Sequence, residues 1–138
     1  LFLTKMKKKV GRIENISFPE LKIDKIKAKV DTGAYGVAIH VDDIRHEDGK
    51  LYFKIDSEEF SYDKFKTVSV KSSFGRVQKR FSILTKIIIG DSIYKFYVSL
   101  TDRKKMRYPV LIGRRFLYKF NYLVDVTKKN INDTNKKV

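Results

Sequence analysis

Apolar and polar positions alternate along most of this chain with a period of two residues, the pattern of β-strands that bury one face. In segment 93–100, for example, Phe96, Val98 and Leu100 fall on one side, whereas Lys95 and Ser99 fall on the other. Comparable segments, bounded by turn residues, are 9–18, 26–30, 37–41, 51–55, 66–70, 80–90, 93–100, 109–113 and 122–126. The pattern predicts an all-β fold, and strands this short and numerous are typical of a small closed barrel.

Helical spacing is convincing only after Gly113, where Phe116, Leu117 and Phe120 share one side, so we expect one short helix there. The length of 138 residues is typical of one domain, and there is no internal repeat. Apolar periodicity is lost after residue 126. The sequence therefore predicts a single domain over residues 1–127 and a polar, disordered tail over 128–138.

The composition excludes some classes of protein and of chemical site. Apolar residues make up 42% of the chain, but no stretch approaches the roughly 18 consecutive apolar residues of a membrane helix. The first ten residues lack the order of charge and apolarity of a secretory signal. Cysteine is absent, which excludes a disulfide framework, a thiolate metal site and a thiol nucleophile. These features predict a soluble protein and fit a cytoplasmic location.

The formal net charge of +15 suggests a partner of negative charge. Nucleic acid is one alternative, because lysine and arginine neutralise phosphates. However, the basic residues are 23 Lys and only 8 Arg, scattered along the alternating strands. Scattered lysine is typical of solvated strand faces and protected sheet edges, whereas specific base and phosphate contacts favour arginine. The distribution therefore argues against a nucleic-acid binder.

Two short segments carry the candidate chemistry. Asp31-Thr32-Gly33-Ala34 follows the alternating strand 26–30, and Leu111-Ile112-Gly113-Arg114 follows a later strand and leads into the expected helix. Asp, Thr and Gly are common in turns, so an ordinary hairpin corner is one interpretation of the first segment.

The pair of segments resembles the retroviral type of aspartic protease. The resemblance is more specific to a bacterial retropepsin-like family, associated with ATP-grasp peptide ligases and often labelled ATP-dependent zinc proteases. It covers residues 10 to 127 approximately. The matching stretches, in family order, are Gly11-Arg12-Ile13-Glu14, Phe18-Pro19-Glu20-Leu21, 28–34, Thr101-Asp102-Arg103, Met106, 109–114 and 123–126.

The resemblance implies a retropepsin-like barrel in which Asp31 is catalytic. Two such carboxylates held close together share one proton, so that one takes a proton from water while the other donates to the peptide carbonyl. The chain has one Asp-Thr-Gly turn, so the resemblance implies a homodimer that hydrolyses peptides or proteins. By the same resemblance, Thr32 joins the two turns, Gly33 presents backbone to substrate, Ala34 lines the floor and Gly113 packs against the turn.

The resemblance also suggests a flap and a substrate preference. Ser72-Ser73-Phe74-Gly75, between two strand-like runs, is similar to the flap hairpin of these enzymes, although a plain surface hairpin is the alternative. Tyr35 stands where retroviral-type enzymes have an acidic residue that pairs with the arginine after the later glycine. Arg114 then needs Asp102, Asp125 or the partner subunit. Tyr35, Arg103 and Arg107 are possible substrate contacts, and guanidinium groups suit an acidic substrate.

The residues predict no cofactor and no metal site. There is no G-x-x-x-x-G-K-[ST] loop for a nucleotide and no H-E-x-x-H zinc motif. His40 and His46 lie near Asp42, so a loose metal site remains an alternative to surface or hydrogen-bonding roles. For function, the alternative to a peptidase is a retropepsin-like domain that binds peptide or protein without cleaving it.

Overall fold

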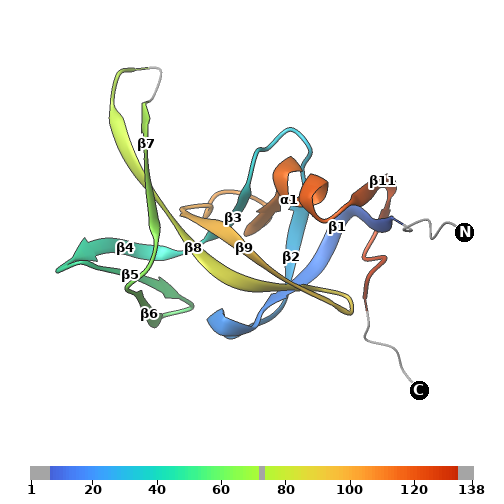
Figure 1. Ribbon diagram of the computed structural model, residues 1–138, viewed down its shortest axis with the longest axis horizontal. Helices are drawn as coiled ribbons and strands as arrows, with labels where there is room; N and C mark the ends of the chain where they lie inside the picture. The colour runs from blue at the N-terminus through green and yellow to red at the C-terminus, as the bar shows by residue number, and fades with distance from the viewer. Residues whose placement is uncertain (1–6, 72–73, 134–138) are drawn as a thin grey trace, which may run out of the picture.

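The computed structural model describes residues 7–71 and 74–133, and it confirms the all-β class (Figure 1). The helical segments are η1 (Pro19–Leu21) and α1 (Arg114–Lys119), and no helix in the described part of the chain is long and apolar enough to cross a membrane. The strands are β1 (Lys8–Phe18), β2 (Ile23–Val30), β3 (Val37–His40), β4 (Asp42–Glu47), β5 (Lys50–Ile55), β6 (Glu58–Tyr62), β7 (Lys66–Lys71), β8 (Val77–Ile89), β9 (Ser92–Thr101), β10 (Val110–Ile112) and β11 (Tyr122–Lys129). Strands β4 and β6 were not predicted, because both are mostly polar.

The strands form two sheets. The larger has eight strands in the order β11-β1-β2-β10-β3-β9-β8-β7, and the smaller has the order β4-β5-β6. The short strand β10 lies between β2, to which it is parallel, and β3, to which it is antiparallel. Strand β1 also meets β8 through a bridge between Ser17 and Ile88. Closure of the sheet into a barrel remains a prediction.

Aromatic packing holds α1 against the sheet. Phe116 of α1 is fully buried and contacts the rings of Tyr94, Phe96 and Phe120 edge-on, at centroid distances of 4.8 to 5.3 Å. Such pairs contribute about 0.5–1.5 kcal/mol each beyond the apolar area that they bury. The helix α1 is therefore fixed against β9.

A buried carboxylate extends the folded body beyond the expected domain end. Strand β11 continues to Lys129, and Glu14, which is fully buried in β1, accepts the N–H groups of Ile131 (3.3 Å) and Asn132 (3.2 Å). The expected boundary at residue 127 therefore falls inside β11, because the polar residues that follow are held by backbone hydrogen bonds rather than by apolar side chains. The rest of the expected tail, residues 134–138, lies outside the described residues.

Candidate active site

The β2–β3 connection, residues 31–36, is a tight turn that fixes Asp31. The N–H of Asp31 donates to Ile112 O of β10 (2.9 Å), and the Asp31 carboxylate accepts the N–H of Gly33 through Oδ1 (2.9 Å). The N–H of Ala34 donates to Asp31 O (3.1 Å). The side chain of Asp31 is 32% exposed, with Lys29 Nζ 4.0 Å from Oδ2. The carboxylate is thus oriented by backbone groups and open to solvent on one side.

The start of α1 holds the same turn from the other side. The N–H groups of Arg114 and Arg115 donate to Ala34 O (2.9 Å) and Tyr35 O (3.0 Å). A Cβ atom on Gly113 would lie 2.4 Å from Gly36 O, so only glycine allows this approach of two backbones. The structure therefore brings together the two segments that the sequence singled out, although 77 residues or more separate them along the chain.

Arg114 has neither of the carboxylate partners that we expected from its own chain. Its Nη1 donates to Gly33 O (3.2 Å), and its guanidinium lies 5.4 Å from the ring of Tyr35. The guanidinium of Arg115 lies 5.2 Å from the same ring. Asp102 and Asp125 instead accept the N–H groups of the residues two positions after them. Tyr35, the departure from the family pattern, thus replaces an ion pair with cation–π contacts.

The two other arginines proposed for substrate contact lie in the loop 102–109, which precedes β10. Arg103 donates from Nε to Tyr108 O (3.1 Å), and the guanidinium of Arg107 lies 5.5 Å from the ring of Tyr108. The loop enters β10 at Val110, whereas the Asp31 turn contacts the other end of β10 at Ile112. The loop that carries Arg103 and Arg107 therefore meets the opposite end of β10 from the Asp31 turn and Arg114.

The expected flap corresponds to the hairpin of β7 and β8. The strands pair antiparallel up to Lys71 and Val77, and the hairpin extends away from the rest of the molecule (Figure 1). Phe74 is 91% exposed and Gly75 has a φ of 83°, which suits glycine in a turn. Ser72 and Ser73 lie outside the described residues.

The histidines do not form a metal cluster. Within residues 7–71 and 74–133, no group of three or more His, Cys, Asp or Glu side chains could hold a metal ion. His46 packs against the rings of Phe65 (5.1 Å) and Phe81 (5.9 Å). His40 has polar contacts, including Asp42 Oδ1 at 3.3 Å from its Nε2. Sequence reasoning placed His40 near Asp42 but did not identify the other contacts of His40, which come from residues over 60 positions away.

Beneath α1, two tyrosine hydroxyl groups share a hydrogen bond that sequence reasoning did not find. Tyr94 Oη and Tyr122 Oη lie 2.6 Å apart, and Lys8 Nζ donates to Tyr94 Oη (3.2 Å). Burial and the hydrogen bond to Tyr94 raise the pKa of Tyr122. Burial also raises the pKa of Tyr94, but its hydrogen bonds with Tyr122, Ser92 and Lys8 outweigh burial, so the net pKa is lowered.

The chain matches the family model of the RimB-like retropepsin-like aspartic endopeptidases over residues 9–135. A solved structure of a Legionella pneumophila protein of unknown function is similar as well. It is 27% identical with a TM-score of 0.71, and the match covers 93% of this chain and 100% of that one.

Curated relatives carry the name of a ligase. A probable alpha-L-glutamate ligase of Desulfotalea psychrophila is 31% identical over 120 residues, which is 78% of this chain and 26% of the ligase. A protein of the same name from Shewanella halifaxensis is 30% identical over 117 residues, 76% of this chain and 26% of that protein. The chain therefore spans about a quarter of the length of these relatives.

Proposed function

Since the chain belongs to the RimB-like family of retropepsin-like aspartic endopeptidases, we propose that it is an aspartic endopeptidase that acts as a homodimer. The observation that carries this proposal is the Asp31 turn. Its carboxylate is oriented by the N–H of Gly33 and is partly exposed, and the close backbone approach at Gly113 leaves the turn little freedom to move. A carboxylate held in this way is suited to proton transfer with a bound water.

In the proposed mechanism, the Asp31 carboxylates of two subunits meet at the two-fold axis. Two carboxylates within hydrogen-bonding distance of each other cannot both ionise easily, so the pair shares one proton. The ionised group takes a proton from the attacking water, and the protonated group donates to the oxygen of the scissile carbonyl. The pair thus provides base and acid catalysis in one step.

The neighbours of Asp31 support this arrangement. Thr32 and Gly33 are exposed in the single chain, so the Thr32 hydroxyl is available to the turn of the partner subunit and Gly33 can present its backbone to substrate. Ala34 then lines the floor of the cleft. The β7–β8 hairpin, with its exposed Phe74, closes over the substrate and excludes water.

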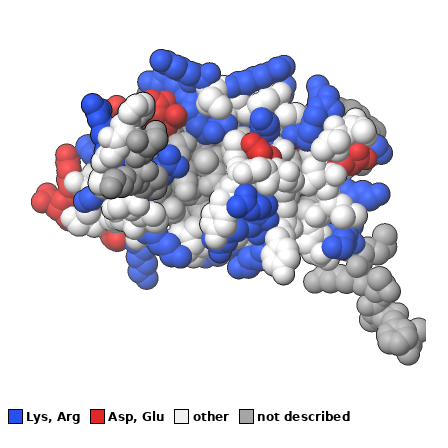
Figure 2. Space-filling view, turned by 90° about the horizontal axis from the view of Figure 1, so that it is seen from above, with Lys and Arg blue, Asp and Glu red and all other residues white. Residues whose placement is uncertain are grey.

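We further propose that the substrate is acidic. Seen from the side toward which the β2–β3 connection and the β7–β8 hairpin point in Figure 1, the surface carries more Lys and Arg than Asp and Glu (Figure 2). Arg114 and Arg115 lie beside the Asp31 turn, and Arg103 and Arg107 lie in the loop before β10. Guanidinium groups bind carboxylates through paired hydrogen bonds. The names of the ligase relatives make glutamate-rich peptides the first choice of substrate.

The match to part of longer ligases supports a functional link to an ATP-grasp ligase. It also favours a second candidate function, a domain that binds the acidic peptide for such a ligase and does not cleave it. The two candidates differ in what Asp31 does. A peptidase needs its carboxylate for turnover, whereas a binding domain needs only the surrounding cations.

The deciding experiment compares wild type with Asp31→Asn on glutamate-rich peptides and on matched glutamine-rich peptides at mildly acidic to neutral pH. We expect cleavage of the acidic peptides by wild type and no cleavage by the variant, with dimerisation unchanged in sedimentation. Binding of acidic peptides by both proteins without cleavage would favour the binding domain. Equal cleavage of both peptide sets would reject the acidic preference.

A further inference from the structure

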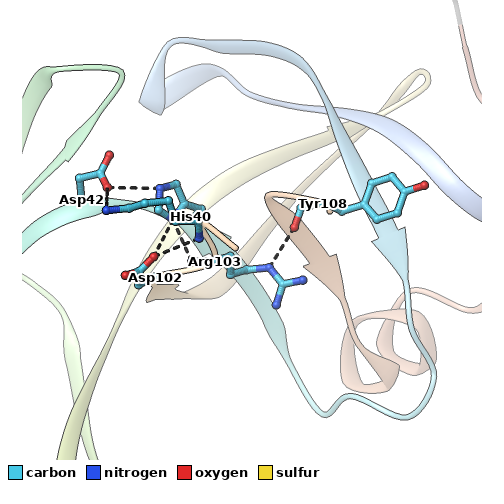
Figure 3. A network of polar contacts seen from close by, with 6 residues as sticks. His40, Asp42, Asp102, Arg103 and Tyr108 are labelled. Atoms are coloured by element: carbon cyan, nitrogen blue, oxygen red, sulfur yellow. Dashed lines mark hydrogen bonds and ion pairs between the residues drawn. The ribbon is translucent and has the colours of Figure 1, made fainter. Parts of the chain in front are cut away.

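His40, the last residue of β3, holds both ends of the loop 102–109. Its backbone N–H donates to Pro109 O (2.8 Å), and its Nδ1 accepts the N–H of Arg103 (2.8 Å). In Figure 3, His40 lies next to Asp42 and Asp102, with Arg103 beside it and Tyr108 on the far side of Arg103. The loop also closes on itself, because Arg103 Nε donates to Tyr108 O. One histidine therefore connects the start of the loop to its end.

The contacts of His40 require one particular protonation state. A ring nitrogen can accept a hydrogen bond only when it carries no proton, so Nδ1 must be bare to accept the N–H of Arg103. In the neutral ring the proton then lies on Nε2, which faces Asp42 Oδ1 at 3.3 Å. The clamp between His40 and Arg103 thus exists only in the neutral Nε2–H form.

Protonation of His40 breaks this clamp. A proton on Nδ1 would point at the N–H of Arg103, and two donors cannot share a hydrogen bond. Asp102 Oδ1, 3.6 Å from Nδ1, is the nearby acceptor for the new proton. The charged ring therefore gains contact with Asp102 and loses Arg103.

Other charged groups surround the ring. Lys104 Nζ lies 3.8 Å from the Asp42 oxygen that faces Nε2. The cavities beside His40 are also lined by charged residues of the β1–β2 connection, of β2, β4 and β5, and of the β5–β6 turn: Lys22, Asp24, Lys25, Asp43, Lys54 and Asp56. These residues carry both positive and negative charges. What distinguishes the protonated ring is therefore the contact at Nδ1, where the Asp102 carboxylate replaces the N–H of Arg103.

We propose that His40 is a positioning residue for the substrate: in its neutral form it fixes the loop 102–109, which carries the proposed substrate contacts Arg103 and Arg107, and its protonation releases the Arg103 end of that loop. The effect on substrate binding rests on the proposed peptidase function, whereas the contact between His40 and Arg103 does not. Release of the loop weakens substrate binding and leaves the Asp31 turn in place, because that turn is held by Ile112 and α1. Acidic pH therefore raises KM more than it lowers kcat.

Two variants separate the contacts of the ring. In His40→Asn the side-chain oxygen can replace Nδ1 and accept the N–H of Arg103, whereas in His40→Gln the longer side chain replaces Nε2 and reaches toward Asp42. Neither side chain takes up a proton between pH 5 and 8, the range in which histidine ordinarily titrates. The two variants therefore test which contact of the ring fixes the loop and whether protonation of His40 releases the loop.

The first measurement is amide hydrogen exchange of Arg103 by NMR, expressed as protection relative to the unstructured rate at each pH. We expect wild-type protection to fall about fivefold between pH 8 and 5, as for loss of one hydrogen bond. In His40→Asn the Arg103 amide should stay protected at both pH values, whereas in His40→Gln its protection should be low at both. Equal protection in the two variants, or no pH dependence in wild type, overturns the proposal. This result is independent of peptide cleavage, so failure of the peptidase function leaves it intact.

The second measurement is the KM of acidic peptides for the same proteins. We expect KM to rise about fivefold in His40→Gln, with kcat within about twofold of wild type, and His40→Asn to restore the wild-type KM at neutral pH. His40→Asn should also keep this KM at pH 5, where we expect the KM of wild type to rise. A change in Arg103 protection without a change in KM would overturn the role in substrate positioning.

Discussion

Substitution of Gly113 by alanine tests the contact that locates the Asp31 turn. The added Cβ would lie 2.4 Å from Gly36 O and 2.7 Å from Ala34 O, whereas real Cβ contacts are essentially never below 3.0 Å. Backbone must therefore move by at least 0.6 Å at the tighter contact. The neighbours are backbone atoms of the turn, which α1 holds through Ala34 O and Tyr35 O. Relief is therefore costly, and we expect a loss of about 2 kcal/mol in the free energy of unfolding.

The same movement should reach Asp31. Displacement of a catalytic group by about 1 Å costs on the order of 100-fold in rate, so a shift of about half that size should lower kcat roughly tenfold. Urea unfolding and peptide cleavage give the two values. Gly36→Ala is the matched control, because no atom lies within 4 Å of its added Cβ, and we expect its stability within about 0.5 kcal/mol of wild type. Gly113→Ala with the stability and kcat of this control would refute the reasoning.

Three further predictions concern Glu14, Tyr122 and Tyr35. Glu14→Gln replaces one of the oxygens that accept backbone N–H groups with an amide donor, and it should lower the free energy of unfolding by about 2 kcal/mol in urea, whereas the exposed control Glu47→Gln should change little. Tyr122→Phe removes the hydroxyl that stabilises ionised Tyr94; because that contact lowers the pKa of Tyr94, its titration followed by NMR should move to higher pH, and an unchanged titration contradicts the assignment. Tyr35→Ala should raise the KM for acidic peptides about threefold by freeing the guanidiniums that now lie over the ring, whereas Tyr35→Phe should keep the wild-type KM.

The parts of the fold that sequence reasoning found are those with a local signal. Two-residue alternation identified β9, and Gly113 followed by apolar residues at helical spacing identified α1. The resemblance then linked the segments around Asp31 and Gly113, which the structure joins through backbone hydrogen bonds. Short motifs succeed here because turn geometry depends on a few adjacent residues.

The parts that it missed depend on partners distant in the chain. Glu14 occupies an inward-facing position of β1, which is unusual for an acidic residue and was an unused signal, but its backbone partners Ile131 and Asn132 lie 117 residues or more away on the C-terminal side. Arg114 was expected to need a carboxylate, since an ion pair is the simplest partner for a guanidinium. A tyrosine ring serves the same cation, and sequence spacing does not distinguish the two.

The most direct test of the central claim is a mixing experiment in which wild type and Asp31→Asn exchange subunits before peptide cleavage is measured. If each site needs Asp31 from both subunits, activity follows the fraction of dimers with two wild-type chains. An equal mixture at constant total wild-type plus variant concentration should then retain about a quarter of the activity of wild type alone. Retention of about half would mean that each chain acts by itself, which would contradict the account of a shared site.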